Sequence, residues 1–464
     1  MKHQLINRVK RLGLIFCLLS IQAHVQADDR KCRPIPPDND ECRDRAIWEQ
    51  PSCPCPSGRP ISFGRALEGV EIPIKLYGYA KWEGYWDTRQ PLGAREEQTL
   101  YFPLPVKLDP RGVDINDRGR WHMTAIESRL GLALTGPTWG CISSLGVLEG
   151  DFRGPSEATI SSFRLRHAYG LVSWETGSFL FGQWYQPLYI VECFPHTVGF
   201  DIGIPMDSQA RAPQLLLKQR WNDFELRFCL SSERDFASNG PFGVSTIYIR
   251  NAVIPSIHLQ GRWFIGDQLI GIAGDYKRLT PRIESDTGYS VNEKVDSFIF
   301  EAFVSLIHPP WSARFKTFWA ENANFHLLLS GFGVKTIEPI TDKRTYSPTA
   351  CTGAWFDFSY IFGCDDNELG LFFGGTKNLG SRDRLYVDPV TQLPIIYAFT
   401  PIGQNIDYVV RVTPRFVMKR DPIRFGVEVG WTRTSYGTPN ACGKVINGVP
   451  VDNVRILFAL YYVF

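Results

Sequence analysis

The sequence lacks the marks of a helical membrane protein and of an enzyme. Beyond residue 27, no stretch approaches the roughly 18 consecutive apolar residues that a membrane-spanning helix requires. A mature chain that crosses a membrane must therefore do so without helices. Only 4 residues are Met and 8 are His, and no HExxH, GxSxG or Walker sequence is present. Because a hydrolase needs an organised nucleophile and base, we expect no enzymatic activity.

A large excess of one charge is missing as well. The chain has 50 Lys and Arg against 48 Asp and Glu, which gives a formal net charge of +2. Four of the basic residues lie within the first 27 positions, so the rest of the chain carries about −2. This balance argues against a nucleic-acid partner.

The N-terminus has the pattern of an export signal. A basic start precedes an apolar run over residues 12–21, and small residues at Val25 and Ala27 offer a cleavage site. The run is too short to span a bilayer. We predict a signal peptide over residues 1–27 and a polar, Pro- and Cys-rich periplasmic extension over residues 28–70.

The extension contains four cysteines: Cys32, Cys42, Cys53 and Cys55. An exported chain enters an oxidising compartment, where such cysteines form disulfides. A metal site is the alternative, but no second CxxC and no HxxxH completes it. We therefore expect disulfides here, and no metal or cofactor.

Aromatic residues are abundant at 13%, and from residue 72 the hydrophobic pattern has a period of two. Leu76, Trp82 and Trp86 share one face of the first segment, while Tyr77 and Lys81 lie on the other. A helix would mix these sets, whereas a strand separates them. One such strand would suit a soluble sandwich equally well.

The alternation recurs often enough to predict a transmembrane antiparallel β-barrel of about sixteen strands over residues 71–464. Bacterial outer-membrane barrels have an even number of strands. The predicted strands are 72–87, 121–135, 141–152, 161–174, 178–186, 213–221, 223–231, 254–264, 268–277, 294–307, 311–320, 352–362, 367–376, 404–417, 422–433 and 452–464.

The connections between these strands alternate in length, and this favours a membrane barrel over a sandwich. Tight turns such as 136–140, 175–177 and 266–267 alternate with long polar segments such as 88–120 and 321–351. Outer-membrane barrels have short periplasmic turns and long extracellular loops, whereas a sandwich has no reason to keep such an order.

The last predicted strand is apolar at every second position and ends in an aromatic residue, Phe464. Such a strand resembles the signal that the barrel-assembly machinery reads. If it closes the barrel, residues near 453–464 should pair antiparallel with residues near 74–86.

Basic residues recur on the faces that should point inward. Charges facing lipid would cost about 2–4 kcal/mol each at the midplane, so the alternation places them in the lumen. The candidate pore-lining residues are Arg129, Arg164, Arg166, Lys218, Arg220, Arg262, Arg411, Arg415 and Arg455. An Arg-rich lumen would attract anions. Alternatively, these side chains pair with neighbouring acids and select little.

The loop over residues 187–212 is unusually apolar for an extracellular segment. Folding into the barrel would bury its apolar groups and set Glu192, Asp201 and Asp207 against the basic wall. We predict that it forms a constriction. The alternative is that it packs on a neighbouring subunit.

Four motifs follow one another in a familiar order: Ser128-Arg129-Leu130-Gly131, Leu148-Glu149-Gly150-Asp151-Phe152, Phe163-Arg164-Leu165-Arg166-His167-Ala168-Tyr169 and Phe181-Gly182-Gln183-Trp184. This series resembles the general porin superfamily, and within it the DcaP-like porins. The match covers roughly residues 76–221.

The resemblance implies a sixteen-stranded homotrimeric barrel, an inward third loop and passive uptake of small, often anionic solutes. It singles out Arg164 and Arg166, then Arg129, as pore-lining. The chain departs from the family at residues 28–70, which lack the family's coiled-coil pattern and could form intermolecular disulfides instead.

The main hypothesis is an outer-membrane porin with an Arg-lined lumen. The alternative is a disulfide-linked structural or adhesive envelope protein whose pore is incidental. A dedicated transporter of apolar molecules would need an N-terminal plug, and residues 28–70 are too polar for one.

Overall fold

The computed structural model describes residues 65–67, 70–71, 73–363, 366–400 and 402–464. The chain divides into two units, 1–41 and 42–464, and only the second contains described residues. The predicted signal peptide, most of the predicted extension, and Cys32, Cys42, Cys53 and Cys55 therefore lie outside the described part.

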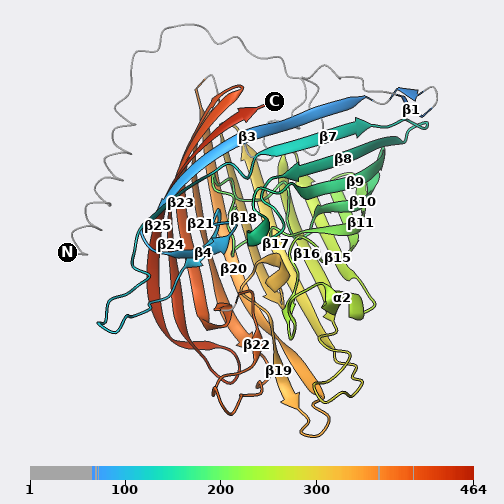
Figure 1. Cartoon of the computed structure of the whole chain (residues 1–464). Coiled ribbons are helices and arrows are strands. Elements are labelled where there is room, and N and C mark those ends of the chain that lie inside the picture. The colour runs from blue at the N-terminus through green and yellow to red at the C-terminus, as the bar shows by residue number, and fades with distance from the viewer. Residues whose placement is uncertain (1–64, 68–69, 72, 364–365, 401) are drawn as a thin grey trace. The chain divides into compact units, whose positions relative to one another are not determined.

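The described residues form a closed antiparallel barrel of sixteen strands, as predicted (Figure 1). One position is shared by two short strands, β6 and β7, which both pair with β3. The barrel strands are β3 (Ile74–Asp87), β6 (Arg120–Thr124) with β7 (Arg129–Thr135), β8 (Ser143–Asp151), β9 (Arg164–Trp174), β10 (Gly177–Tyr185), β11 (Arg211–Trp221), β12 (Phe224–Ser231), β15 (Ser256–Ile265), β16 (Gln268–Leu279), β17 (Val295–His308), β18 (Trp311–Glu321), β20 (Arg344–Phe362), β21 (Asn367–Ser381), β23 (Ile406–Arg420), β24 (Ile423–Pro439) and β25 (Val445–Val463).

The barrel closes between β3 and β25, which confirms the predicted pairing of the first and last strands. The register runs antiparallel from Arg455 opposite Asp87 to Val463 opposite Tyr79. Phe464 continues the ladder beyond β25, because its backbone N–H and C=O both bond to Gly78, each at 3.0 Å. The terminal residue therefore helps to seal the seam.

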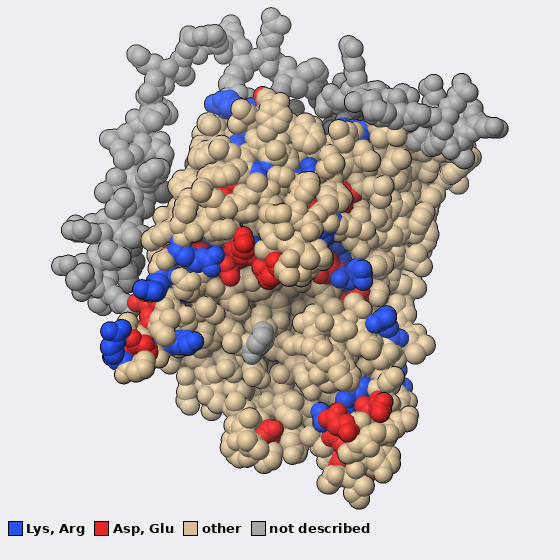
Figure 2. Space-filling view, viewed as in Figure 1, with Lys and Arg blue, Asp and Glu red and all other residues tan. Residues whose placement is uncertain are grey.

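Side chains alternate between the outside and the inside of the wall, as the period of two predicts. On β7, Arg129 is buried and faces inward, while Leu130 is exposed on the outer face. On β9, Arg164 and Arg166 are buried and the intervening Leu165 is exposed. Charged side chains gather in a band across the middle of the face shown and on the loops below it (Figure 2). The upper part of that face is mostly uncharged.

Short turns join the strands at the end of the barrel where the C-terminus lies, and long segments join them at the other end (Figure 1). The long segments contain the remaining elements. These are β4 (Pro91–Ala94), β5 (Thr99–Pro103), β13 (Asn239–Gly240), β14 (Gly243–Val244), β19 (Phe332–Ile337), β22 (Ile396–Tyr397), the 3-10 turns η2 (Glu157–Thr159), η3 (Asn324–His326) and η4 (Gly403–Asn405), and the helix α2 (Ile247–Asn251). Two further strands, β1 (Arg65–Leu67) and β2 (Val70–Glu71), pair near the start of the described part. Among the residues described, no helix is long and apolar enough to cross a membrane.

Several strands differ from their predicted bounds, and at two of them a contact with another segment explains the difference. The predicted strand over 121–135 is interrupted at residues 125–128, where Ile126 and Glu127 turn inward and are buried. There, Glu127 binds Lys81 of β3. The strand predicted over 352–362 begins eight residues earlier, because its first residues pair with β19 of a long loop.

Candidate functional site

The interior of the barrel is occupied by the segment between β10 and β11, here called the inward loop (residues 186–210). All of its residues are buried except Val191, which is half-buried, and Glu192, which is exposed. Its apolar side chains divide between two clusters. One contains Leu188, Ile190, Ile204 and Met206 with Phe303, Phe318, Trp355 and Phe372 of the wall. The other contains Tyr189, Phe194, Val198 and Ile202 with Tyr79, Leu180, Leu457 and Tyr461.

Polar contacts tie the inward loop to strands on different sides of the barrel. The backbone N–H groups of Val198 and Gly199 donate to the Glu428 carboxylate at 2.6 and 3.3 Å. Asp207 accepts from Lys316 at 2.7 Å, and Asp201 binds Arg411. A side chain at Gly426 would meet Val198 at 2.8 Å, so this glycine permits the close approach of the loop to β24.

Glu192 contacts two other strands of the wall, β12 and β15. Its carboxylate lies 2.8 Å from Arg262 and 3.3 Å from Arg227. The three acids predicted in this loop, Glu192, Asp201 and Asp207, therefore each contact a basic residue of the wall.

Two further segments reach into the interior, and the sequence did not predict either. The hairpin β4–β5 buries Leu100 and Phe102, and Phe102 joins the cluster that contains Leu188. The segment after β18 buries Ala323 and Leu328 in that cluster as well. Their buried residues form the unbroken runs 98–103 and 322–331 within long loops, so they show no alternation that would mark them.

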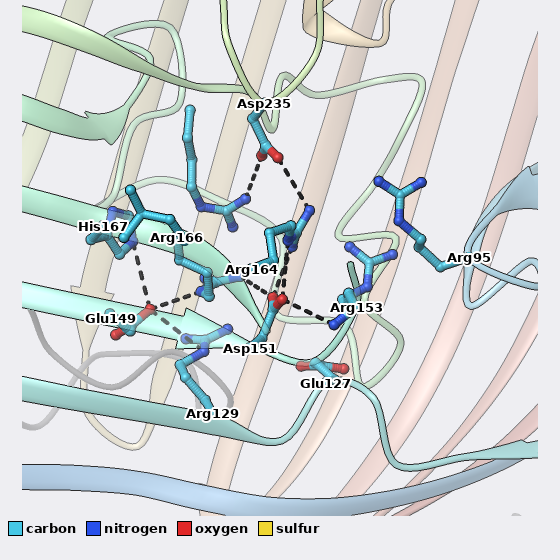
Figure 3. A network of polar contacts seen from close by, with 12 residues as sticks. Arg95, Glu127, Arg129, Glu149, Asp151, Arg153, Arg164, Arg166, His167 and Asp235 are labelled. Carbon is cyan, nitrogen blue, oxygen red and sulfur yellow. Dashed lines mark hydrogen bonds and ion pairs between the residues drawn. The ribbon is translucent and has the colours of Figure 1, made fainter. Parts of the chain in front are cut away.

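Arginines from β7, β9 and β11 and from the loop after β8 meet carboxylates on one side of the interior (Figure 3). The members of this arginine cluster are Arg129, Arg153, Arg164, Arg166, Arg211, Glu149, Asp151 and Asp235. The Arg164 side chain donates to both oxygens of Asp151 at 3.0 and 2.8 Å, and to Asp235 at 3.1 Å. The Arg166 side chain donates to Glu149 at 2.8 Å and to Asp151 at 3.3 Å.

Arg153 is one of the two arginines of this cluster, with Arg211, that sequence reasoning missed. It follows β8 and was assigned to a loop, yet its guanidinium is buried and lies 3.7 Å from the centre of the Phe200 ring. It donates to Gln98 at 2.6 Å and to Thr99 of the β4–β5 hairpin. Both of these partners are neutral, so its charge is less directly compensated than that of Arg164. Burial and the neighbouring Arg164 lower the pKa of Arg153.

The nine predicted pore-lining residues occupy four kinds of place. Arg129, Arg164 and Arg166 belong to the arginine cluster, and Arg262 and Arg411 contact the inward loop. Arg415 and Arg455 are buried against the wall, where they bind Asp357 and Asp87 in bidentate fashion.

Lys218 and Arg220 lie near the short turn after β11. Lys218 is half-buried and Arg220 is exposed. Arg220 donates to the backbone carbonyl of Asn222 at 2.8 Å and stacks over Phe264. These two residues are therefore away from the arginine cluster.

The native cysteines offer a direct check on the inward loop. We expect a maleimide to label Cys141, which is exposed on a short turn, while Cys193 of the inward loop reacts more than about a hundredfold more slowly in the folded protein. Burial raises the pKa of the Cys193 thiol to about 12, so little thiolate is present at neutral pH. Labelled peptides are identified by mass spectrometry before and after unfolding. Fast labelling of Cys193 in the folded barrel would contradict its burial.

Five cysteines within the described ranges are free: Cys141, Cys193, Cys229, Cys351 and Cys442. The same residues include no group of His, Cys, Asp and Glu placed to hold a metal ion.

Comparison with solved structures finds outer-membrane porins and channels. No protein-family model matches the chain, and no curated protein sequence matches it. The outer-membrane channel DcaP of Acinetobacter baumannii is similar over 87% of this chain and 100% of its own, with a TM-score of 0.61 and 14% identity. The outer-membrane-expressed OmpT of Vibrio cholerae is similar over 86% of this chain and 99% of its own, with a TM-score of 0.50 and 11% identity.

These likenesses define a porin-like fold. More narrowly, the fold is DcaP-like, as the order of the sequence motifs indicated. At such low identity, the comparisons concern the fold and carry no solute or activity over to this chain.

Proposed function

We propose that this protein is a porin of the bacterial outer membrane that admits small hydrophilic solutes, with a preference for anions, by passive diffusion. The fold shared with outer-membrane channels supports the general function. In this proposal, residues 1–27 direct export, the C-terminal strand ending at Phe464 is read by the barrel-assembly machinery, and three copies associate in the lipid bilayer.

The arginine cluster supports the preference for anions. It contains five guanidinium groups and three carboxylates, which lie on the inward face of the wall and on the adjoining loops. The excess positive charge lies in surroundings from which water is largely excluded, where charges are screened less than in bulk solvent. An entering anion is therefore attracted, and a cation is repelled.

The position of the inward loop supports a narrow part of the channel beside the arginine cluster. Its acids contact basic residues of the wall, and its Phe200 stacks on Arg153 of the cluster. The loop and the cluster together would set the size and the charge of the solutes that pass.

Replacing Arg164 and Arg166 with Ala tests this proposal. We expect the reversal potential in a salt gradient across a planar bilayer to shift toward cations, because two positive charges leave the cluster while Glu149 and Asp151 remain. Replacing Lys218 and Arg220 with Ala removes the same charge near the short-turn end, and should shift the reversal potential less. An equal ratio of anion to cation permeability in both variants would show that the cluster does not set selectivity. A wild-type protein without conductance would overturn the porin function itself.

A further inference from the structure

The inward face of β15 differs from the arginine cluster in how its polar groups are satisfied. Four consecutive inward residues are polar and almost fully buried: Ser256, His258, Gln260 and Arg262. Neither amide atom of Gln260 has a hydrogen-bond partner, and neither do the ring nitrogens of His258 or the hydroxyl of Ser256. On Arg262, Nη1 binds Glu225 at 3.0 Å, but Nε has no partner.

Two carboxylates on the adjoining strands extend this surface. The register places Asp275 of β16 opposite His258. It also places Ala273 between Gln260 and Glu301 of β17. Asp275 and Glu301 are buried, and each has one oxygen without a hydrogen-bond partner. The six residues Ser256, His258, Gln260, Arg262, Asp275 and Glu301 are called the polar track below.

Such a concentration of unsatisfied atoms needs an explanation. Most buried polar groups in proteins are hydrogen-bonded, because a buried group without a partner has lost its hydrogen bonds to water and gained none in return. The costs on neighbouring residues of one strand face would accumulate. They are relieved if these groups bond to a solute that enters when the covering segments withdraw.

The inward loop and the segment after β18 contact this part of the wall partly through polar groups that a solute could replace. Glu192 of the inward loop reaches Arg262 but is itself exposed. The backbone carbonyl of Asn322 accepts from Lys277 at 2.8 Å, while both amide atoms of Asn322 have no partner. The cover therefore leaves polar groups unsatisfied on its own side as well.

We propose that the polar track binds neutral, polyhydroxylated solutes such as short oligosaccharides, in a step that rests on the porin function proposed above. The hydroxyl, imidazole and amide groups of the track can each donate and accept, which matches a sugar hydroxyl. The charges nearby are largely paired within the wall, since Glu301 lies 3.1 Å from Lys316 and Arg262 lies 3.0 Å from Glu225, so an ionic solute gains little there. Alternate residues of a strand lie about 7 Å apart, and four of them present polar groups over roughly 20 Å, the length of a short linear oligosaccharide.

The test measures binding and ion flow separately on the full-length protein. Maltotriose is titrated in detergent while tryptophan fluorescence is followed, and it is then added to a conducting bilayer. We expect saturable binding and partial block of the ion current. Polyethylene glycol of similar mass, which accepts hydrogen bonds but has few donors, should block much less.

The variant Gln260→Leu should raise the maltotriose concentration for half-saturation about tenfold, as the loss of one or two hydrogen bonds implies. The matched control is Gln214→Leu on β11, whose amide already donates to the Tyr185 carbonyl at 2.7 Å and accepts from Cys229. This control should leave the sugar affinity unchanged. If Gln260→Leu fails to fold, as judged by heat-modifiable migration on gels, Ser256→Ala gives the second measurement and should weaken binding about threefold.

The outcomes separate the two proposals. A wild-type channel that conducts anions but neither binds maltotriose nor distinguishes it from polyethylene glycol overturns the polar track and leaves the porin function standing. Equal weakening by Gln214→Leu also overturns the track. A protein that binds the sugar but carries no current overturns the porin function and keeps the binding site.

Discussion

Replacing residues 188–208 with a short Gly-Ser turn should raise the single-channel conductance severalfold. The inward loop fills the interior with two apolar clusters, whereas barrels with sixteen strands are wide enough for an aqueous channel. The replacement is compatible with the wall, because β10 and β11 pair directly from Gly177–Gln219 to Tyr185–Arg211. A short turn can therefore connect Gln186 to Arg211 without a change of register. Planar-bilayer recordings measure the conductance, and liposome swelling measures the size limit for neutral solutes.

A matched control removes a loop that does not enter the interior. Residues 338–340 form the exposed part of the turn between β19 and β20, and replacing them with Gly-Ser-Gly should leave the conductance unchanged. Conductance that stays at the wild-type level after excision of the inward loop would mean that this loop does not lie across the path of ions. Loss of the folded barrel would instead show that the two clusters are needed for assembly, and gel mobility distinguishes the two results.

The strands could be predicted because their signal is local. Each alternates over seven or more residues, and tight turns separate them at every second connection. The closing pair followed from the same rule, since an even number of strands brings the first beside the last. The prediction fails where a distant contact overrides the local pattern. The interruption at residues 125–128 is an example, because it allows Glu127 to bind Lys81 of β3.

The inward direction of the basic residues was also predictable, but their partners were not. The alternation of side chains along β9 places Arg166 in the interior, but it does not identify the partner of this residue. Glu149 lies on β8, and the pairing of β8 with β9 brings the two side chains together. Arg153 lies beyond the end of β8, so the alternation of side chains along the strand does not predict which way it points. Sequence alone therefore predicts which arginines face the interior. Which of them are paired with a carboxylate depends on the three-dimensional fold.

Arg415 was predicted to line the pore, but it lies within a buried group of ion pairs, and its removal should affect stability strongly. We expect Arg415→Ala to lower the free energy of unfolding by about 3–5 kcal/mol, as breaking a buried ion pair does. Arg415 donates to both oxygens of Asp357 at 2.7 and 3.0 Å, to Glu368 at 2.9 Å and to Ser359 at 2.6 Å. Its removal leaves two buried carboxylates without their cation. Guanidinium unfolding of the liposome-inserted barrel, followed by tryptophan fluorescence, measures the change.

The same loss should be recovered when the whole charged group is replaced. In the triple variant Arg415→Met, Asp357→Leu and Glu368→Gln, the cation and both of its carboxylate partners are neutralised together, and we expect stability near that of the wild type. Arg220→Ala removes an arginine that is exposed near the short-turn end, and should change stability by less than about 0.5 kcal/mol. If Arg415→Ala were as mild as Arg220→Ala, Arg415 would be a hydrated residue of the channel lining. A large loss in Arg415→Ala that the triple variant recovers would instead identify this arginine as a structural residue of the wall, whose charge is used by Asp357 and Glu368 and not by solutes.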